Sequence, residues 1–452
     1  MTFRLAIRAL TSRPVRSAVL AGGFGFGIAV MAALLGVGEV ILDQARSPAL
    51  SGGGDVVATG ATGMLGSARL ITSSVLSSRP LVGRAAAFSP SLKGRLYLVR
   101  PEGILPLEAR GGIPSLERAI ADPETAGIRA WVDAPADASW SSPDPGDVLR
   151  AMDRFHPIPV GSPRAASWAE WLYFNGRSRD AKLYLTFLFG PKNDRGNRVA
   201  GVRLQLDRHG EMTNYTDTAE VPEDALLASA PDVQIGRCRV RLEGLRYRIT
   251  LALSGLEGEL TLDAEPGRSL APVAIHGAEG WVSGYVVPVL SGRLGGTLRI
   301  GEDVLTLDGG AGYHDHNWGF WEGVSWQWGQ VAGEGISIVY GRVRPPADVA
   351  DPARVPGFLA VLGPDGPVGF SADVSIGETD DPTLARPRRI VVQARGEAIE
   401  LRMELDVEGA VRTRWIGGPV DLFQLRGPYR VEGRVAGRSV SFTAAGSAET
   451  FR

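Results

Sequence analysis

The densest group of side chains able to do chemistry lies between residues 312 and 328. The run from Gly312 to Gly319 reads Gly-Tyr-His-Asp-His-Asn-Trp-Gly. Four aromatic residues follow it: Phe320, Trp321, Trp326 and Trp328. His314 and His316 have the spacing of two metal ligands on one face of a strand, but a zinc site needs at least a third ligand. The remaining histidines, His156, His209 and His276, show no paired spacing.

The same run has a second face if it forms a strand, because successive strand side chains point in opposite directions. The two histidines then share one face. Three other side chains share the opposite face: Tyr313, Asp315 and Asn317. Trp326 and Trp328 share a face of the strand that follows. If this strand belongs to a barrel, one of the two sets of side chains points into the barrel interior and the other does not.

The elements that must position these side chains are short strands. From about residue 165 the apolar residues alternate or run in short stretches, as in 181–190 and 246–255, and turn residues such as 301–303 separate them. Regularly spaced antiparallel hairpins predict a barrel or sandwich, in which closure removes exposed strand edges. The stretch is too long for one small eight-stranded barrel. We therefore predict an all-β fold with two tandem antiparallel barrels, residues 151–320 and 321–452.

The run Gly312–Gly319 resembles the signature of carotenoid 1,2-hydratases (hydroxyneurosporene synthases) and AttH-like proteins. Upstream, 169–176 (AEWLYFNG) resembles the EWWYF-x-G element of that family, with Leu172 where a second Trp is usual. Residues 273–285 and 444–451 lie where family members carry comparable glycine and aromatic elements. The resemblance covers about residues 150–452, and it implies a pair of lipocalin-like barrels.

The resemblance also implies roles for individual residues. Asp315 corresponds to the proton donor of the hydratases, with Tyr313 beside it. Side chains expected to bind a ligand are Glu170, Trp281, Asn317, Trp318, Trp326 and Trp328. A carboxyl in an apolar cavity has a raised pKa and stays protonated near neutral pH. It could protonate a terminal isoprenoid double bond, and aromatic faces would stabilise the resulting cation by roughly 0.5–2 kcal/mol each. No metal or organic cofactor is implied.

Structural roles remain open for the same residues. Asp315 and Asn317 could bond to backbone groups at a strand end. The tryptophans could serve as core packing. Glu170, an acid within an aromatic element, could be a buried structural partner, and the histidines could be outward-facing or hydrogen-bonded.

The N-terminal region predicts a membrane anchor. Ser17–Gly38 carries no charge and has the length of about 20 residues that a helix needs to cross a bilayer. Four arginines and no acid precede it: Arg4, Arg8, Arg13 and Arg16. Glu39 and Asp43 follow it. The positive-inside bias places the start in the cytoplasm and the bulk of the chain outside, in a single-pass protein of the cytoplasmic membrane. A cleaved signal peptide is the alternative.

Residues 6–50 also resemble the first membrane helix of FtsX/MacB-like ABC-transporter permeases, which suggests an origin beside an exporter. Residues 1–45 then form the cytoplasmic start and the membrane helix, and 46–150 a small membrane-proximal region with a linker. That region is rich in small residues, and we assign no chemistry to it.

Composition narrows the function classes. The chain has 452 residues with 48 Lys and Arg against 50 Asp and Glu, so it has no basic excess to suggest a dedicated nucleic-acid binder. Its lone cysteine, Cys238, excludes an internal disulfide framework and a Cys-based zinc site.

The sequence therefore predicts a membrane-anchored protein that binds a hydrophobic, isoprenoid or lipid-like ligand. Acid-initiated hydration or cyclisation of an alkene, a hydro-lyase type of reaction, is the specific hypothesis. Two alternatives remain: a non-catalytic lipid-binding accessory protein of ABC transporter subunits, and a metal-dependent hydrolase.

Overall fold

The computed structural model describes residues 84–452 apart from 101–102, 123–124, 126–127, 142, 266–267, 364–365, 384–385 and 415–420, together with residues 12, 14, 15, 19, 24, 26, 30, 31, 57 and 72. The predicted span Ser17–Gly38 and its arginine-rich flank thus fall largely outside the described residues. Within the part of the chain that is described, no helix combines the length and the apolar character that a membrane crossing requires.

The chain divides into two compact units, Met1–Leu65 with Ala86–Ala138, and Gly66–Ala85 with Ser139–Arg452. The smaller unit holds an antiparallel hairpin whose strands pair from Ser91↔Gly112 to Arg100↔Gly103. Its elements are β1 (Ser91–Arg100), β2 (Gly103–Gly112), the helix α5 (Pro114–Ala119) and the 3₁₀ turn η1 (Pro135–Asp137). A short helix, α6 (Ala138–Ser141), lies at the boundary of the two units.

The larger unit begins with a helix and a 3₁₀ turn and continues into a 12-stranded antiparallel sheet. Its leading elements are α7 (Pro145–Met152) and η2 (Ala165–Ser167). The strands of this first sheet are β3 (Trp168–Arg177), β4 (Ala181–Lys192), β5 (Asn197–Arg208), β6 (Glu211–Pro222), β7 (Val233–Ile235), β8 (Cys238–Glu243), β9 (Arg246–Leu253), β10 (Leu256–Asp263), β11 (Leu270–His276), β12 (Val282–Ile300), β13 (Asp303–Thr306) and β14 (Gly310–Phe320). The helix α8 (Glu223–Ser229) and the turn η3 (Ala278–Gly280) interrupt the series.

The first sheet curls into a nearly closed barrel. Its main path runs β6-β5-β4-β3-β14-β12-β10-β9-β8-β7, and the two end strands come into contact. Side chains alternate between the two faces of this sheet: on β9 those of Tyr247, Ile249, Leu251 and Leu253 are buried, whereas those between them are more exposed. The barrel interior is therefore filled by one side-chain set from each strand.

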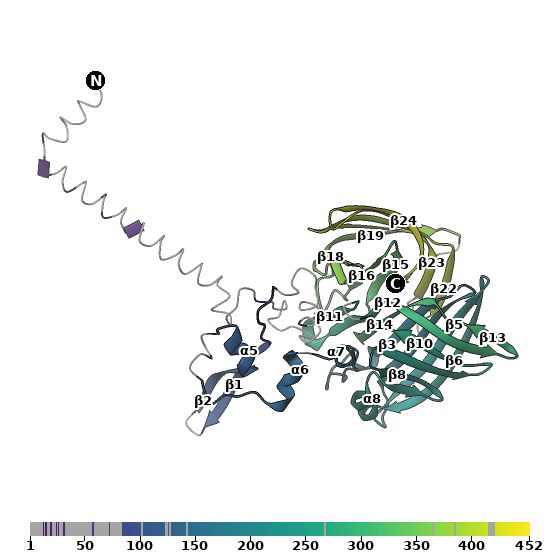
Figure 1. Cartoon of the computed structure of the whole chain (residues 1–452), viewed down its shortest axis with the longest axis horizontal. Helices are drawn as coiled ribbons and strands as arrows, with labels where there is room; N and C mark the ends of the chain where they lie inside the picture. Colours follow the sequence, from purple (N-terminus) through teal and green to yellow (C-terminus); the bar gives the residue numbers. More distant parts are fainter. Residues whose placement is uncertain are drawn as a thin grey trace. The chain divides into compact units, whose positions relative to one another are not determined.

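A second, ten-stranded antiparallel sheet follows and forms a half-barrel (Figure 1). Its path is β18-β17-β16-β15-β24-β23-β21-β20-β19. Its elements are β15 (Ser325–Gly333), β16 (Ile336–Arg344), η4 (Pro352–Arg354), β17 (Phe358–Gly363), β18 (Gly366–Ser371), β19 (Asp373–Asp381), β20 (Arg386–Arg395), β21 (Ile399–Asp406), β22 (Gly409–Arg414), β23 (Asp421–Val435) and β24 (Arg438–Phe451). The predicted all-β fold with barrel units in tandem is confirmed, although the second unit curls only part of the way round.

The two sheets pack against each other through β3, β12 and β14 of the first and β15, β16 and β17 of the second. Trp326, Trp328 and Val343 of the second sheet belong to the hydrophobic core of the first barrel, whereas the remaining face of the second sheet has a core of its own. β14 is consequently buried on both faces over most of its length. One face looks into the first barrel, and the other looks at the second sheet.

Candidate functional site

Asp315 lines a small cavity between the two sheets. The cavity measures about 10 Å³, room for a single water. Mostly aromatic and acidic side chains surround it, from β3, β14, β15 and β24, with one aliphatic side chain from β16. The residues that line it are Trp171, Asp315, Asn317, Trp321, Trp326, Trp328, Val343 and Glu449.

The environment of the Asp315 carboxyl favours its protonated form. Its side chain belongs to a residue only 4% exposed, and Asn317 Nδ2 donates a hydrogen bond to its Oδ1 at 2.7 Å. Burial, and then the charge of Glu449, raise the pKa of Asp315 well above its usual value. A carboxyl group that keeps its proton at neutral pH can act as a general acid.

Tyr313 lies directly beside the cavity. Its hydroxyl accepts a hydrogen bond from Trp328 Nε1 at 2.9 Å and also interacts with Asp315. Burial raises the pKa of Tyr313 well above 10, so the phenol stays neutral. Tyr313 can therefore orient the Asp315 carboxyl and carries no charge itself.

Glu449 is a second acid in the site, and the sequence reasoning did not single it out. It lies on β24, and Gln424 Nε2 donates to its Oε1 at 3.3 Å. Burial raises the pKa of Glu449 to about 7, against the opposing effect of hydrogen bonds with Gln424, Trp326 and Tyr173. The sequence feature that could have indicated Glu449 is its position as an acid within the 444–451 element. Only the pairing of β24 with β15 brings it to Asp315.

Tryptophan rings form one wall of the cavity. The ring centroids of Trp171 and Trp321 are 4.6 Å apart, and those of Trp321 and Trp326 are 5.1 Å apart. Trp326 also stacks on Phe451 with centroids 4.0 Å apart. This wall could stabilise a developing positive charge next to the two acids.

The opposite face of β14 carries a different arrangement, a buried network inside the first barrel. Both ring nitrogens of His316 are hydrogen-bonded to carboxylates, Nδ1 to Asp153 at 2.8 Å and Nε2 to Glu170 at 3.1 Å. Asp153 also bonds His314 Nε2 at 3.0 Å and accepts from the Tyr247 hydroxyl at 2.7 Å. Burial alone would lower the pKa of His316, but the two carboxylates outweigh it and raise the pKa to about 9.

Glu170 is the second carboxylate of this network. It accepts from the backbone N–H of His156 at 2.9 Å and from Arg198 Nη1 at 3.1 Å. Arg198 is fully buried and also pairs with Glu223 at 2.7 Å. Burial alone would raise the pKa of Glu170, but its hydrogen bonds with His156 and His316 outweigh burial and lower the pKa. Both Asp153 and Arg198 lie outside the motifs singled out in the sequence.

The structure thus places the proposed ligand-binding residues in three locations. Asn317, Trp326 and Trp328 line the cavity with Asp315. Glu170 and Trp318 lie on the other face of the sheet, where Trp318 stacks on His156 with centroids 4.0 Å apart. Trp281 follows η3, is 1% exposed, and does not line this cavity.

The same network contains three side chains of the types that bind metal ions. His156, Glu170 and His316 each offer a ligand atom, and these atoms lie within 4.8 Å of one another. They are already joined by hydrogen bonds, and the Arg198 guanidinium contacts Glu170. A cation would have to break those bonds and lie beside another cation, so this donor set fits a charge-balanced core better than a metal centre.

Comparison with known proteins gives structural likenesses only. No protein-family model and no curated protein matches the sequence. The fold is similar to a putative AttH from Nitrosomonas europaea, with 15% identity and a TM-score of 0.45 over 66% of this chain and 99% of that one. It is also similar to kievitone hydratase from Nectria haematococca (13% identity, TM-score 0.45, 67% and 94% covered) and to CghA (12%, 0.43, 63% and 88%). Because these TM-scores are below 0.5, the likenesses carry no argument about function. The function is therefore argued from the residues of this chain.

Proposed function

We propose that this protein is an enzyme that protonates an alkene in a hydrophobic, isoprenoid or lipid-like ligand, with Asp315 as the acid. The observation that carries the proposal is the pair of carboxyl groups, Asp315 and Glu449, at one tryptophan-lined cavity. Both have raised pKa values, but to different extents. Two acids whose environments separate their pKa values are suited to opposite roles, one giving a proton and the other taking one.

In the reaction we propose, the Asp315 O–H bond breaks as its proton moves to one alkene carbon, which leaves a tertiary carbocation on the neighbouring carbon. The faces of Trp171 and Trp326 stabilise that cation. In hydration, the oxygen of a water attacks the cation, and the ionised Glu449 takes the proton that the water loses. In cyclisation, a second double bond attacks, and Glu449 removes a proton from the resulting cation. A proton transfer from Glu449 to Asp315 then restores the starting state.

The size of the cavity restricts how the ligand enters. A volume of about 10 Å³ accommodates the water of the hydration step but no part of an isoprenoid chain. We therefore expect tryptophan side chains of the wall to change rotamer when the ligand binds. Trp171 is only half-buried, which makes it the first candidate to move.

Such a ligand would come from the membrane, in keeping with the anchor and external location that the N-terminal sequence predicts. The anchor, the ligand and an association with ABC transporter subunits belong to the same proposal. They rest on the sequence alone.

The test begins with the full-length protein. Its bound lipids are extracted and identified by mass spectrometry, in the native chain and in Asp315→Asn. The extract is then offered back to each protein in isotopically labelled water. We expect the native chain to produce a labelled, hydrated product or a cyclised isomer, and Asp315→Asn to bind the same lipid unchanged.

The control is Asp224→Asn, which removes an exposed carboxyl on α8 and should behave like the native chain. Recovery of the same unaltered lipid from all three proteins would contradict catalysis and favour the lipid-binding accessory role. Loss of activity on metal chelation would instead favour the hydrolase.

A further inference from the structure

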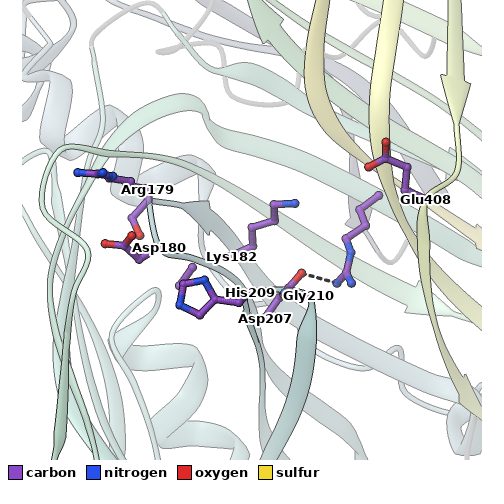
Figure 2. A pocket seen from close by; sticks show the side chains of 10 residues that line it. Arg179, Asp180, Lys182, Asp207, His209, Gly210 and Glu408 are labelled. Carbon is purple, nitrogen blue, oxygen red and sulfur yellow. Dashed lines mark hydrogen bonds and ion pairs between the residues drawn. The ribbon is translucent and has the colours of Figure 1, made fainter.

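A second cavity lies between the two sheets, at the ends of their strands and apart from Asp315. It measures about 320 Å³, at the lower end of the roughly 300–1,000 Å³ of small-molecule sites. The first sheet contributes the β3–β4 and β5–β6 turns, and the second contributes Glu408 and Arg426. Figure 2 shows Lys182 and Glu408 facing this space from the two sheets.

Arg426 is a fixed cation on one side of the cavity. Its Nη1 lies 2.7 Å from Asp207 Oδ2, an ion pair that joins β23 to β5. Asp207 is 4% exposed, and its other oxygen accepts the Gly210 N–H at 2.8 Å. A Cβ on Gly409 would lie 2.4 Å from Arg426 Nε, so the guanidinium is packed directly against the backbone there. These contacts orient Arg426 before any ligand arrives.

Two side chains at this cavity, Ser178 and Lys182, have no ion-pair or hydrogen-bond partner in the described part of the chain, and a third, Arg426, is only partly engaged. Its Nη1 forms the ion pair with Asp207, although that contact lacks hydrogen-bond geometry. The hydroxyl of Ser178 is buried and has no hydrogen-bond partner among the described residues. Lys182 is half-buried and lies opposite Asp207 in the β4–β5 register, and no ion pair to it occurs in the described part of the chain. Buried donors without acceptors are costly, and an acceptor-rich ligand would satisfy them.

The charges at the rim narrow the class of ligand. Asp180 and Glu408 are exposed carboxylates that also line the cavity, and Arg179 is an exposed cation there, so a ligand with negative charge at several places would be repelled at two of them. A ligand with one anionic group directed at Lys182 and Arg426 avoids these two carboxylates, and the charge of Asp207 beside it is balanced by its ion pair with Arg426. Charged hydrogen bonds to such a group are stronger than neutral ones.

We propose that this cavity binds a small organic anion through a single carboxylate or phosphate group, held by Lys182, Arg426 and the Ser178 hydroxyl. Lys182 and Ser178 belong to the first sheet and Arg426 to the second, so the bound anion joins the two sheets. The ligand then stabilises the packing that also forms the Asp315 cavity, without taking part in its chemistry.

The experiment measures binding of inorganic phosphate and of acetate to the full-length protein by calorimetry, with thermal unfolding in parallel. We expect saturable binding of one or both probes and a rise in Tm with probe concentration, because a ligand that binds only the folded state stabilises it. The probe that binds more tightly distinguishes a phosphate from a carboxylate group. Binding should weaken as ionic strength rises.

Variants make the test specific. Lys182→Met should weaken binding roughly tenfold or more, Ser178→Ala by less, and Lys182→Arg should retain it. Arg438→Met removes an exposed charge at the start of β24 and is the matched control. Asp315→Asn should bind the probe like the native chain, which separates this site from the proposed catalysis.

The proposal is overturned if neither probe gives saturable binding, or if Arg438→Met weakens binding as much as Lys182→Met does. If Lys182→Met fails to fold, Ser178→Ala is compared with Arg438→Met instead. Weaker binding in Ser178→Ala alone supports the proposal, and equal weakening in the two variants overturns it.

Discussion

The two faces of β14 meet acids in opposite states, although the strand residues His316 and Asp315 that point to those faces are neighbours in the sequence. Inside the first barrel, Asp153 and Glu170 face His316 and Arg198, and both carboxyl pKa values are lowered. Between the sheets, Asp315 meets tryptophan rings and another acid, and its pKa is raised. Burial is comparable on the two faces. The placement of cations therefore decides which acids stay charged and structural and which keep a proton to donate.

The largest effect should come from removing the buried cation of the inner network. Arg198→Met leaves Glu170 and Glu223 without their shared partner, which should cost about 3–5 kcal/mol in the free energy of unfolding. Urea unfolding followed by tryptophan fluorescence would measure the loss. Arg195→Met, an exposed change on the same hairpin, is the control. A loss below about 1 kcal/mol would show that the inner network does not hold its charges as described.

The inner network should also give the protein a characteristic dependence of stability on pH. The pKa of His316 is about 9 in the folded state against 6.5 in the unfolded chain, so its contribution is fully present below pH 6.5 and is lost as the pH rises towards 9. At about 1.4 kcal/mol per pKa unit, the contribution is on the order of 3 kcal/mol. Unfolding measured across this window should show the decline in the native chain but not in His316→Gln. Parallel curves for the two proteins would contradict the assignment.

On the outer face, Glu449→Gln should lower kcat roughly 100-fold, as expected for the loss of a general base. In the native chain the ionised form of Glu449 is the active one, so kcat should rise with pH through about 7. The variant should lack that rise, while any fall at higher pH from ionisation of Asp315 should remain. Glu404→Gln changes an acid on β21 outside the cavity and serves as the control. An unchanged pH profile in Glu449→Gln would exclude it as the base.

The smallest effect should come from the aromatic wall. Trp326→Leu keeps an apolar surface but removes the ring, and a cation–π contribution of about 0.5–1 kcal/mol corresponds to a two- to fivefold loss in kcat. KM should rise as well, because the ring also forms part of the cavity wall. Phe320→Leu, a core change on β14 that does not line the cavity, controls for packing. Equal effects of the two variants on kcat would leave the ring with a packing role only.

The sequence by itself determined the strands, and it determined that Asp315 and His316 lie on opposite faces of β14. Period-two alternation is a local property of the chain, so the separation of Asp315 from His316 could be predicted without knowing what either face meets. The all-β class followed from the same pattern. The N-terminal membrane span stays a prediction from composition.

Only the tertiary structure decided what stands opposite each face. Glu449 reaches Asp315 because β24 pairs with β15 and the second sheet packs on the first, and Asp153 reaches His316 from the segment that follows α7. Asp153 has no local sequence signature, and the 444–451 element that contains Glu449 does not indicate which residue it meets, because sheet closure and sheet packing are set by contacts between residues far apart in the chain. The state of a carboxyl group depends on those contacts, so its chemical role could be decided only once the fold had assembled them.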